Sequence, residues 1–413
     1  MSRAGSAQQA RSIRGVQPAS HLRRSRWLHR IGLALLVLAL LCGLLIAWKP
    51  SRVALQTAIL IPSLLGAGPQ PLELFSASPR RDTLRYRSDP AAASDLADLW
   101  LPATASARQR VGAMVLVLGV NNVGRQYPAV VRFGQAMARS GVAVLIPDSA
   151  DLLAGRFSPA AVGGVVDAVD TLAAQPEVDP ARIGLVGLSV GGSLSLLAAS
   201  DPRIVGRIRW VNAFGAYADA GDYLAEVATH SFSLDGETRA WAPSDLTREL
   251  FTRLVVGLVD DAGDRQLLTL AYQQVIVDGS LPAPDPALQR ALQTDAGRDV
   301  YALLTARSLD RARAAVGALP APIHTLLDEL SPVRHLALLR AQVFVMSDTG
   351  DTYIPFVESR RLAAVLRPAG HLARMTELRL FDHVEPEGVD LIGAAPEVGK
   401  LLWHVQAVLL QTL

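Results

Sequence analysis

Cysteine is almost absent from the 413-residue chain, which contains only Cys42. A single thiol forms no intramolecular disulfide and builds no metal site from several thiolates. The folded part must therefore be stabilised by its hydrophobic core. With 50% hydrophobic residues, the chain is too apolar for a disordered protein and long enough for one large or two ordinary domains.

Acidic side chains are absent from residues 1–52, which carry nine Arg and Lys residues. The net charge of the whole chain is +2, so the remainder has a net charge of −7. The basic charge is thus confined to the N-terminal segment. A basic surface that follows a phosphate backbone is not expected, and the sequence argues against nucleic-acid binding.

The basic segment leads into an uncharged run at residues 31–48, IGLALLVLALLCGLLIAW. As a helix this run is about 27 Å long, close to the thickness of bilayer hydrocarbon. We predict a basic cytoplasmic leader at 1–30 and a transmembrane helix at 31–48. Because the positive charge precedes the helix, the rest of the chain should lie outside the cytoplasm. A cleaved signal peptide is the alternative, although the run is long for one and no A-x-A-like site follows Trp48.

A shorter apolar stretch, VALQTAILIPSLL, occupies residues 53–65. It contains Pro62 and is too short to span a membrane. We predict a linker or membrane-proximal segment at 49–82, in which this stretch either lies on the outer membrane face or packs on the body of the protein. We favour packing.

Apolar runs alternate with helical patterns beyond residue 110. Three runs are typical of strands buried on both faces: residues 113–118, 142–146 and 183–186. Residues 129–139 and 160–174 between them have helical spacing. This order predicts an α/β fold, with a doubly wound and mostly parallel sheet.

The strand pattern stops near residues 210–214 and resumes at 342–346. The intervening residues are predicted to form a helical insertion, because they include helix-like stretches such as 245–259, 265–277 and 298–316. No repeat period is present, so a solenoid is not supported.

The pentapeptide Gly187-Leu188-Ser189-Val190-Gly191 fits G-x-S-x-G and lies directly between a predicted strand and a predicted helix. This context predicts a sharp turn with Ser189 at its tip, flanked by glycines because a Cβ there would collide with neighbouring backbone. The start of the helix directs N–H groups toward developing negative charge. We predict Ser189 as a nucleophile; an ordinary glycine-rich turn is the alternative.

A serine nucleophile needs a base, and the chain contains eight histidines. His383 alone follows the last predicted strand, residues 378–381, at the sheet edge where Ser189 also emerges. We therefore predict His383 as the base, with a surface-loop histidine as the alternative. The other histidines precede the predicted membrane span, lie in the insertion or on helices, or precede the last strand: His21, His29, His230, His324, His335, His371 and His404.

The third member of such a triad orients the imidazole. Asp351 follows the strand at 342–346 and is the first choice, with Asp348 second; either could instead cap a helix or a turn. For the oxyanion hole we predict the backbone N–H groups of Val190 and Val120. Asn121, next to Val120, could assist or only shape the turn.

Residues from about 83 to 413 resemble the α/β-hydrolase superfamily. The stretch VDPARIGLVGLSVGG at 178–192 is most similar to its dienelactone-hydrolase and acetyl-esterase-like branches. The resemblance implies a catalytic domain at 83–214 and 341–413, a helical cap or lid at 215–340, and a Ser189–His383–Asp351 triad. The chain departs from these branches in two places: dienelactone enzymes use a cysteine at the position of Ser189, and Leu118-Gly119 replaces the usual His-Gly.

These features predict a membrane-anchored serine hydrolase that acts on a small-molecule or lipid ester, without a metal or an organic cofactor. A carboxylic ester is favoured over a thioester, an amide or a lipid ester, and a prolyl peptidase is disfavoured because the chain has no room for a propeller. A catalytically inactive scaffold that binds a lipid or a protein is the alternative. The lid should select the substrate, and several of its residues favour an apolar acyl group unless they pack the lid on the body: Phe232, Trp241, Phe251, Leu254 and Val255.

Overall fold

The computed structural model describes residues 33, 43, 48–86, 96–273, 280–381, 383 and 393–413. Residues 53–413 form one unit and residues 1–52 another. The predicted leader and transmembrane helix fall outside the described residues, apart from three single positions. Within the described ranges, no helix is both long and apolar enough to cross a bilayer. The membrane anchor therefore stays a prediction.

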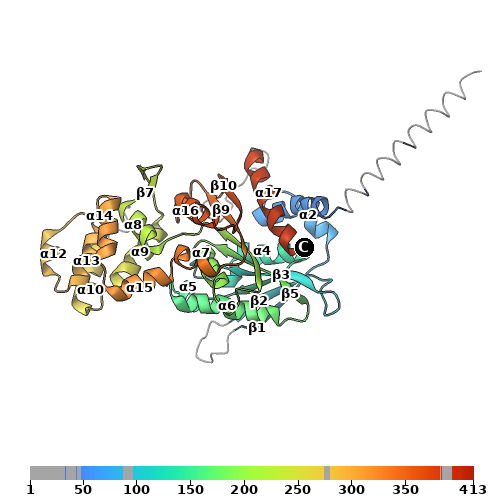
Figure 1. Cartoon of the computed structure of the whole chain (residues 1–413), viewed down its shortest axis with the longest axis horizontal. Helices are drawn as coiled ribbons and strands as arrows, with labels where there is room; N and C mark the ends of the chain where they lie inside the picture. Colours follow the sequence, from blue (N-terminus) through green and yellow to red (C-terminus); the bar gives the residue numbers. More distant parts are fainter. Residues whose placement is uncertain are drawn as a thin grey trace, which may run out of the picture. The chain divides into compact units, whose positions relative to one another are not determined.

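An eight-stranded sheet forms the centre of the unit 53–413, in the order β1-β2-β4-β3-β5-β6-β9-β10 (Figure 1). Strand β2 pairs antiparallel with β1 and β4, and every other pair in the sheet is parallel. The strands are β1 Arg80–Arg85, β2 Leu96–Leu101, β3 Val111–Val117, β4 Ala143–Pro147, β5 Val178–Leu188, β6 Ile208–Phe214, β9 Gln342–Asp348 and β10 Leu372–Leu378. The predicted α/β class with a mostly parallel sheet is confirmed, and the arrangement fits the α/β-hydrolase fold.

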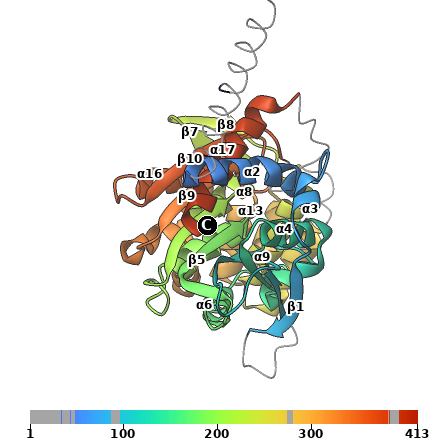
Figure 2. The same ribbon diagram turned by 90° about the vertical axis from the view of Figure 1, so that its right-hand side faces the viewer.

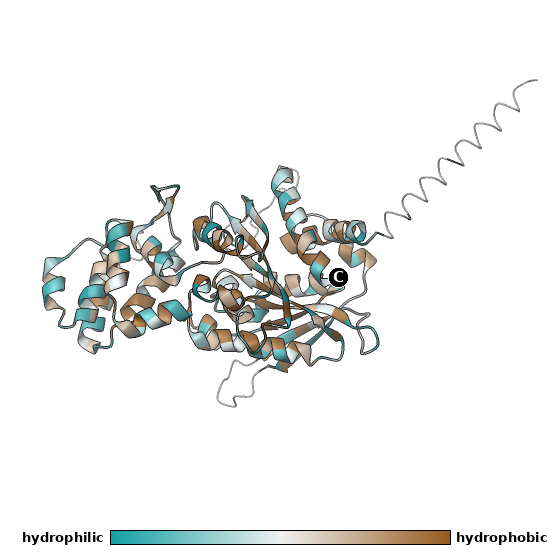
Figure 3. Ribbon diagram, in the orientation of Figure 1, coloured by the Kyte–Doolittle hydropathy of each residue, from teal (hydrophilic) through white to brown (hydrophobic). Residues whose placement is uncertain are grey.

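Helices cover both faces of this sheet. On one face lie α6 (Pro159–Ala173), α7 (Val190–Ala199) and α16 (Phe356–Leu366), and on the other lie α2 (Lys49–Leu65), α4 (Pro128–Arg139) and α17 (Ala395–Thr412). Successive residues of a strand point to opposite faces, so Val115 of β3 belongs to the first core and Met114 to the second. Because both faces are buried, the buried parts of the central strands are mainly hydrophobic (Figure 3).

The apolar stretch at 53–65 belongs to helix α2 and packs on the body. Val53, Leu60, Ile61 and Leu65 are buried there, and α2 lies beside α17 (Figure 2). Each such side chain contributes about 1.5–3 kcal/mol when removed from water. The segment predicted as a linker thus holds α2, a short helix α3 (Pro71–Phe75) and the start of β1, three residues ahead of the predicted boundary at 83.

The chain between β6 and β9 forms a mainly helical insertion. Its helices are α8 Ala220–Thr229, α9 Asp245–Gly257, α10 Ala262–Tyr272, α12 Pro286–Ala291, α13 Asp295–Leu304, α14 Leu309–Ala318 and α15 Ala321–Glu329 (Figure 1). The helix-like stretch 298–316 is divided between α13 and α14, because Ser308 caps a new helix by accepting the N–H of Arg311 at 3.4 Å. The insertion also contains a hairpin of β7 (Ser231–Leu234) and β8 (Glu237–Ala240), which helical spacing did not indicate.

The last strand also differs from its prediction. Residues 378–381 were expected, whereas β10 runs from Leu372 to Leu378 and pairs only with β9. An edge strand needs fewer apolar residues, so its sequence LARMTEL gives a weak strand signal. The remaining short elements are α5 (Ala150–Leu153) and the 3₁₀ turns η1 Gly124–Gln126, η2 Pro332–Arg334 and η3 Leu336–Leu338.

A buried ionic cluster joins the insertion to the sheet domain. Arg361 of α16 pairs with Glu358 on the same helix and with Glu226 of α8, the latter at 2.6 Å. Glu358 also accepts the backbone N–H of Ala218 at 2.7 Å. Burial, with Glu358 nearby, raises the pKa of Glu226 to about 9. The cluster holds the start of the insertion against α16.

Candidate active site

Ser189 occupies the sharp turn between β5 and α7. Its backbone angles are φ 58° and ψ −135°, a conformation that residues other than glycine rarely adopt. The N–H of Ser189 donates to the carbonyl of Phe214 at 2.8 Å, which anchors the turn to the end of β6. The structure thus contains the strained strand-to-helix turn that the sequence predicts.

The glycines around Ser189 permit this turn. A Cβ on Gly187 would lie 2.3 Å from the carbonyl oxygen of Gly191, and a Cβ on Gly191 would lie 2.3 Å from that of Val117. Real Cβ atoms do not approach backbone oxygens so closely, so any larger residue would displace the turn or the neighbouring strand. The structure thus confirms the predicted reason for the two glycines, which is that a Cβ at either position would collide with neighbouring backbone.

His383 and Asp351 form a buried pair. His383 Nδ1 lies 2.7 Å from Asp351 Oδ2. The other carboxylate oxygen of Asp351 accepts the N–H groups of Tyr353 at 2.7 Å and Ile354 at 2.9 Å, which fixes its orientation. The Tyr353 ring stacks on the imidazole at a centroid distance of 4.5 Å. Because Nδ1 faces the carboxylate, Nε2 is the nitrogen that can take a proton from a serine.

The structure brings Ser189 to the same place as this pair. Gly215 directly follows Phe214, whose carbonyl holds Ser189, and a Cβ on Gly215 would lie 3.2 Å from His383 Cε1 and 3.3 Å from Asp351 Oδ2. Ser189 and His383 also line one common cavity. The three side chains predicted as a triad thus converge, although they are far apart in the sequence.

Asp348, the second choice for the acid, has other partners. Its Oδ2 accepts the N–H groups of Leu380 at 2.7 Å and Phe381 at 2.9 Å, and its Oδ1 accepts that of Gly350 at 2.8 Å. Asp348 therefore ties the loop after β9 to the segment that precedes His383. Of the two candidates, Asp351 is the carboxylate aligned with the imidazole.

Both residues predicted as oxyanion donors line the cavity of Ser189. Val190 is the first residue of α7, and Val120 lines the cavity. A Cβ on Gly119 would lie 2.8 Å from Ser189 Cβ, so the loop of residues 119–124, the oxyanion loop, passes directly against the serine. The N–H groups of Val190 and Val120 thus stay the candidate donors.

Asn121 shapes the oxyanion loop. Its Oδ1 accepts the N–H groups of Val123, at 3.2 Å, and Gly124, and its Nδ2 donates to the carbonyl of Gly119 at 3.2 Å. These bonds use the side chain as a turn former. The sequence left two roles open for Asn121, and these bonds show that its side chain shapes the turn.

Other described histidines lie away from Ser189, and within the described ranges His383 is the one that lines the cavity. His404 is buried in α17, where its ring contacts Thr376 Oγ1 at 2.9 Å and Asn212 Oδ1 at 2.8 Å. Burial lowers the pKa of His404 to about 3, so the ring is neutral and structural. His21 and His29 lie outside the described residues.

The cavity above Ser189 has a volume of about 790 Å³, within the usual range for a small-molecule site. Its lining comes from the oxyanion loop, the turn at Ser189 and the insertion helices α8, α9 and α15. The described lining residues include two basic side chains, Arg253 and His383, and no Asp or Glu. No group of three or more His, Cys, Asp or Glu side chains in the described part of the chain could hold a metal ion.

Two of the five lid residues named from the sequence line this cavity, Phe251 and Leu254. Phe232 instead packs edge-on against Phe356, and Val255 is buried in the core. Trp241 has a role that sequence reasoning missed, because its indole N–H donates to the carbonyl of Asp351 at 2.8 Å. No local sequence signal connects these two residues, which lie 110 positions apart.

Comparisons with known proteins find similar solved structures, whereas no family model and no curated protein matches the chain. The chain is similar to an acylaminoacyl peptidase of Pyrococcus horikoshii, with 13% identity and a TM-score of 0.45 over 80% of this chain and 41% of the other. It is also similar to a puromycin-hydrolyzing peptidase of Mycobacterium tuberculosis, with 18% identity and a TM-score of 0.47 over 81% of this chain and 39% of the other. Its similarity to esterase 2 of Thermogutta terrifontis has 15% identity and a TM-score of 0.45 over 78% of this chain and 91% of the other. The chain spans about two fifths of the length of the two peptidases.

Proposed function

We propose that this protein is a serine hydrolase that cleaves carboxylic esters through an acyl-enzyme. The observation that carries the proposal is the convergence of three groups: a strained Ser189, His383 in the wall of the same cavity, and Asp351, whose carboxylate lies 2.7 Å from His383 Nδ1. A serine, a base and an orienting carboxylate in this order are the parts that acyl transfer requires.

The proposed reaction has two halves. Ser189 Oγ attacks the acyl carbonyl while His383 Nε2 takes its proton, and Asp351 stabilises the resulting imidazolium. The N–H groups of Val190 and Val120 bind the oxyanion, and the alcohol leaves with the proton from His383. Water then attacks the acyl-enzyme, gives its proton to His383, and the acid is released as Ser189 recovers its proton.

The cavity lining supports an ester with an apolar acyl group. A peptidase that reads a free amino terminus needs a carboxylate to pair with the ammonium, and none of the described residues that line the cavity provides one. The hydroxyls of Tyr217 and Tyr223 already donate to backbone carbonyls, at 3.0 Å to Leu330 and 2.7 Å to Tyr353. Apolar contact is therefore the main interaction that the wall offers a substrate.

The experiment is a comparison of p-nitrophenyl esters with p-nitroanilides of the same acyl groups, each corrected for its uncatalysed rate of hydrolysis. We expect the corrected kcat/KM of the ester to exceed that of the anilide by at least about tenfold, a difference of about 1.4 kcal/mol in transition-state binding. A higher corrected value for the anilide would instead identify an amidase or peptidase.

The proposal includes the anchor predicted at residues 31–48, which holds the hydrolase at a membrane and outside the cytoplasm. An active periplasmic or extracellular reporter fused after Leu413 agrees with this topology, whereas a fusion active only inside the cytoplasm contradicts it.

A further inference from the structure

Three leucines of helix α9 and the leucine that directly follows it line the cavity of Ser189. Leu246, Leu250, Leu254 and Leu258 follow one another at intervals of four residues, and all four line the cavity. We call this stripe the leucine ridge. Side chains four residues apart share one face of a helix, and the ridge therefore extends for about 18 Å.

The leucine ridge retains contact with solvent although it belongs to a cap that buries other apolar residues. Leu246 is 39% exposed, whereas Val255 of the same helix is fully buried. Leu224 and Val227 of α8 line the same cavity, as do Leu326, Leu327 and Leu330 of α15. Apolar surface on three helices thus surrounds a space that the protein's own side chains leave unfilled.

The polar side chains that the insertion contributes to this lining are already bonded within the protein. Thr247 Oγ1 lies 2.9 Å from Ser244 Oγ, and Arg253 pairs with Glu249 on the exposed side of α9. The Tyr217 and Tyr223 hydroxyls are bonded to backbone, as described above, and burial raises the pKa of Tyr217. A polar acyl group would lose its water without gaining partners here, whereas a hydrocarbon chain loses nothing.

From this distribution we infer that the leucine ridge binds the hydrocarbon chain of a long-chain acyl ester and measures its length. This inference rests on the proposed function and names its substrate class. Each added CH₂ that reaches the ridge should raise kcat/KM about fourfold, until the chain exceeds the space available.

The test is a series of p-nitrophenyl esters from acetate to palmitate, measured with the full chain in detergent below its micelle concentration. The wild type should show a rise in kcat/KM with chain length to an optimum beyond butyrate. Leu254→Trp fills part of the ridge, so the ratio of long-chain to short-chain kcat/KM should fall at least tenfold. The matched control is Leu270→Trp, a 62% exposed leucine of cap helix α10, which should keep the wild-type ratio.

The outcomes separate the two proposals. If the wild type hydrolyses acetate and palmitate esters equally well, the leucine ridge does not bind the acyl chain, but the proposed hydrolase function still holds. If the wild type is inactive on every ester, the proposed ester hydrolase function is itself contradicted. A melting temperature for each variant identifies misfolding. A second variant, Leu250→Trp, tests the same ridge one helical turn away and should also shorten the optimal chain.

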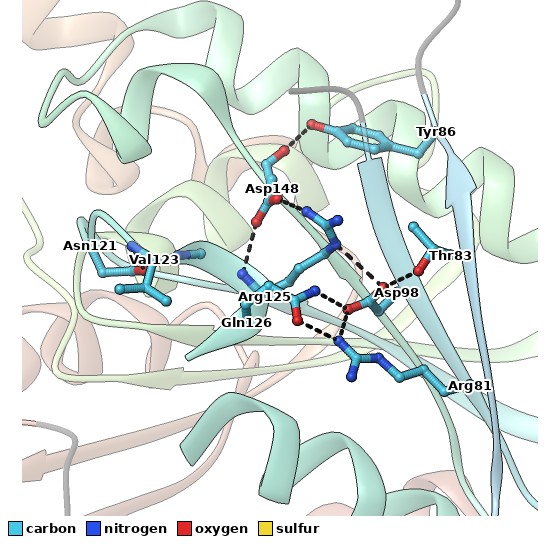
Figure 4. A network of polar contacts seen from close by, with 10 residues as sticks. Arg81, Thr83, Tyr86, Asp98, Asn121, Val123, Arg125, Gln126 and Asp148 are labelled. Carbon is cyan, nitrogen blue, oxygen red and sulfur yellow. Dashed lines mark hydrogen bonds and ion pairs between the residues drawn. The ribbon is translucent and has the colours of Figure 1, made fainter. Parts of the chain in front are cut away.

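A second and independent observation concerns the far end of the oxyanion loop. Asp148, which follows β4, accepts the backbone N–H of Arg125 at 2.8 Å and pairs with its guanidinium (Figure 4). The same guanidinium lies 3.3 Å from Asp98, whose side chain is fully buried. Three more side chains bond to Asp98, at 2.6, 2.7 and 3.2 Å: Arg81, Thr83 and Gln126 (Figure 4).

This network reaches the oxyanion loop through Gly124. The φ of Gly124 is +63°, and a Cβ there would lie 2.2 Å from Asp148 Oδ1, so the loop runs directly over the carboxylate. Asn121 holds the N–H of Gly124 from inside the loop. The loop is therefore fixed at Gly119 against Ser189 and at Gly124 against Asp148, with Val120 between these two points.

The geometry points to Asp148 and Arg125 as positioning residues for the Val120 N–H. We expect Asp148→Asn to lower kcat at least about tenfold with KM changed less than twofold, because the displaced donor acts mainly on the oxyanion. Binding of a trifluoromethyl ketone analogue, which forms a tetrahedral adduct, should weaken by the same factor as kcat. The control Arg81→Gln removes a side chain that bonds to Asp98 and Gln126 but not to Asp148, and it should lower the melting temperature while leaving kcat within about twofold.

A purely structural role for Asp148 predicts a different result. Asp148→Asn would then reduce the melting temperature and the active fraction, with an unchanged kcat per labelled active site and unchanged affinity for the ketone. The same loss of kcat in Arg81→Gln would also contradict a role in positioning the loop.

Discussion

Ser189→Ala is expected to abolish covalent labelling by a fluorophosphonate probe and to reduce ester turnover by about 10⁶-fold in kcat. The reason is that Ser189 occupies the strained turn beside His383, and the acyl-enzyme forms on its hydroxyl. Labelling is measured by gel fluorescence, and turnover by release of p-nitrophenol from purified protein.

The control for this change is Ser193→Ala, one helical turn further along α7. Ser193 is fully buried, and its hydroxyl donates to the carbonyl of Tyr217 at 2.9 Å, so it does not face the cavity. The fluorophosphonate probe should label this variant to the same extent as the wild type. Labelling that survives Ser189→Ala would place the nucleophile elsewhere, and a wild type that is never labelled would favour the catalytically inactive scaffold.

Asp351→Asn is expected to lower kcat by about 10⁴-fold while the protein stays folded. An amide at this position no longer stabilises the imidazolium, and it favours the wrong imidazole tautomer for accepting the serine proton. The two backbone N–H groups that Asp351 accepts can still bond to the amide oxygen, which preserves the loop. Steady-state turnover and a melting curve measure the two effects separately.

Asp348→Asn is the matched comparison. The Asp348 carboxylate holds the segment before His383 through the N–H groups of Leu380 and Phe381, so the change should cost about 1–3 kcal/mol of stability. Its effect on kcat should be much smaller than that of Asp351→Asn. If Asp348→Asn alone eliminates turnover, the assignment of the acid is wrong.

Local patterns predicted most of the fold and the positions of the candidate site. Strands β3 and β4 and residues 183–186 of β5 are continuous apolar runs because both of their faces are buried, and the turn at Ser189 carries its own glycines. Where the local signal is weak, the prediction was wrong: edge strand β10 was placed at 378–381, and the hairpin β7–β8 was missed.

The sequence by itself determined the class of fold, the turn at Ser189, and the separation of basic charge at residues 1–52 from the mildly acidic remainder. These properties depend on residues close together in the chain, where periodicity and steric limits act directly. Only the tertiary structure decided that Asp351 rather than Asp348 meets the imidazole of His383, and that the leucine ridge faces the cavity. The physical reason is that the direction of a side chain in a loop, and the neighbour it meets, depend on the packing of segments that lie far apart in sequence.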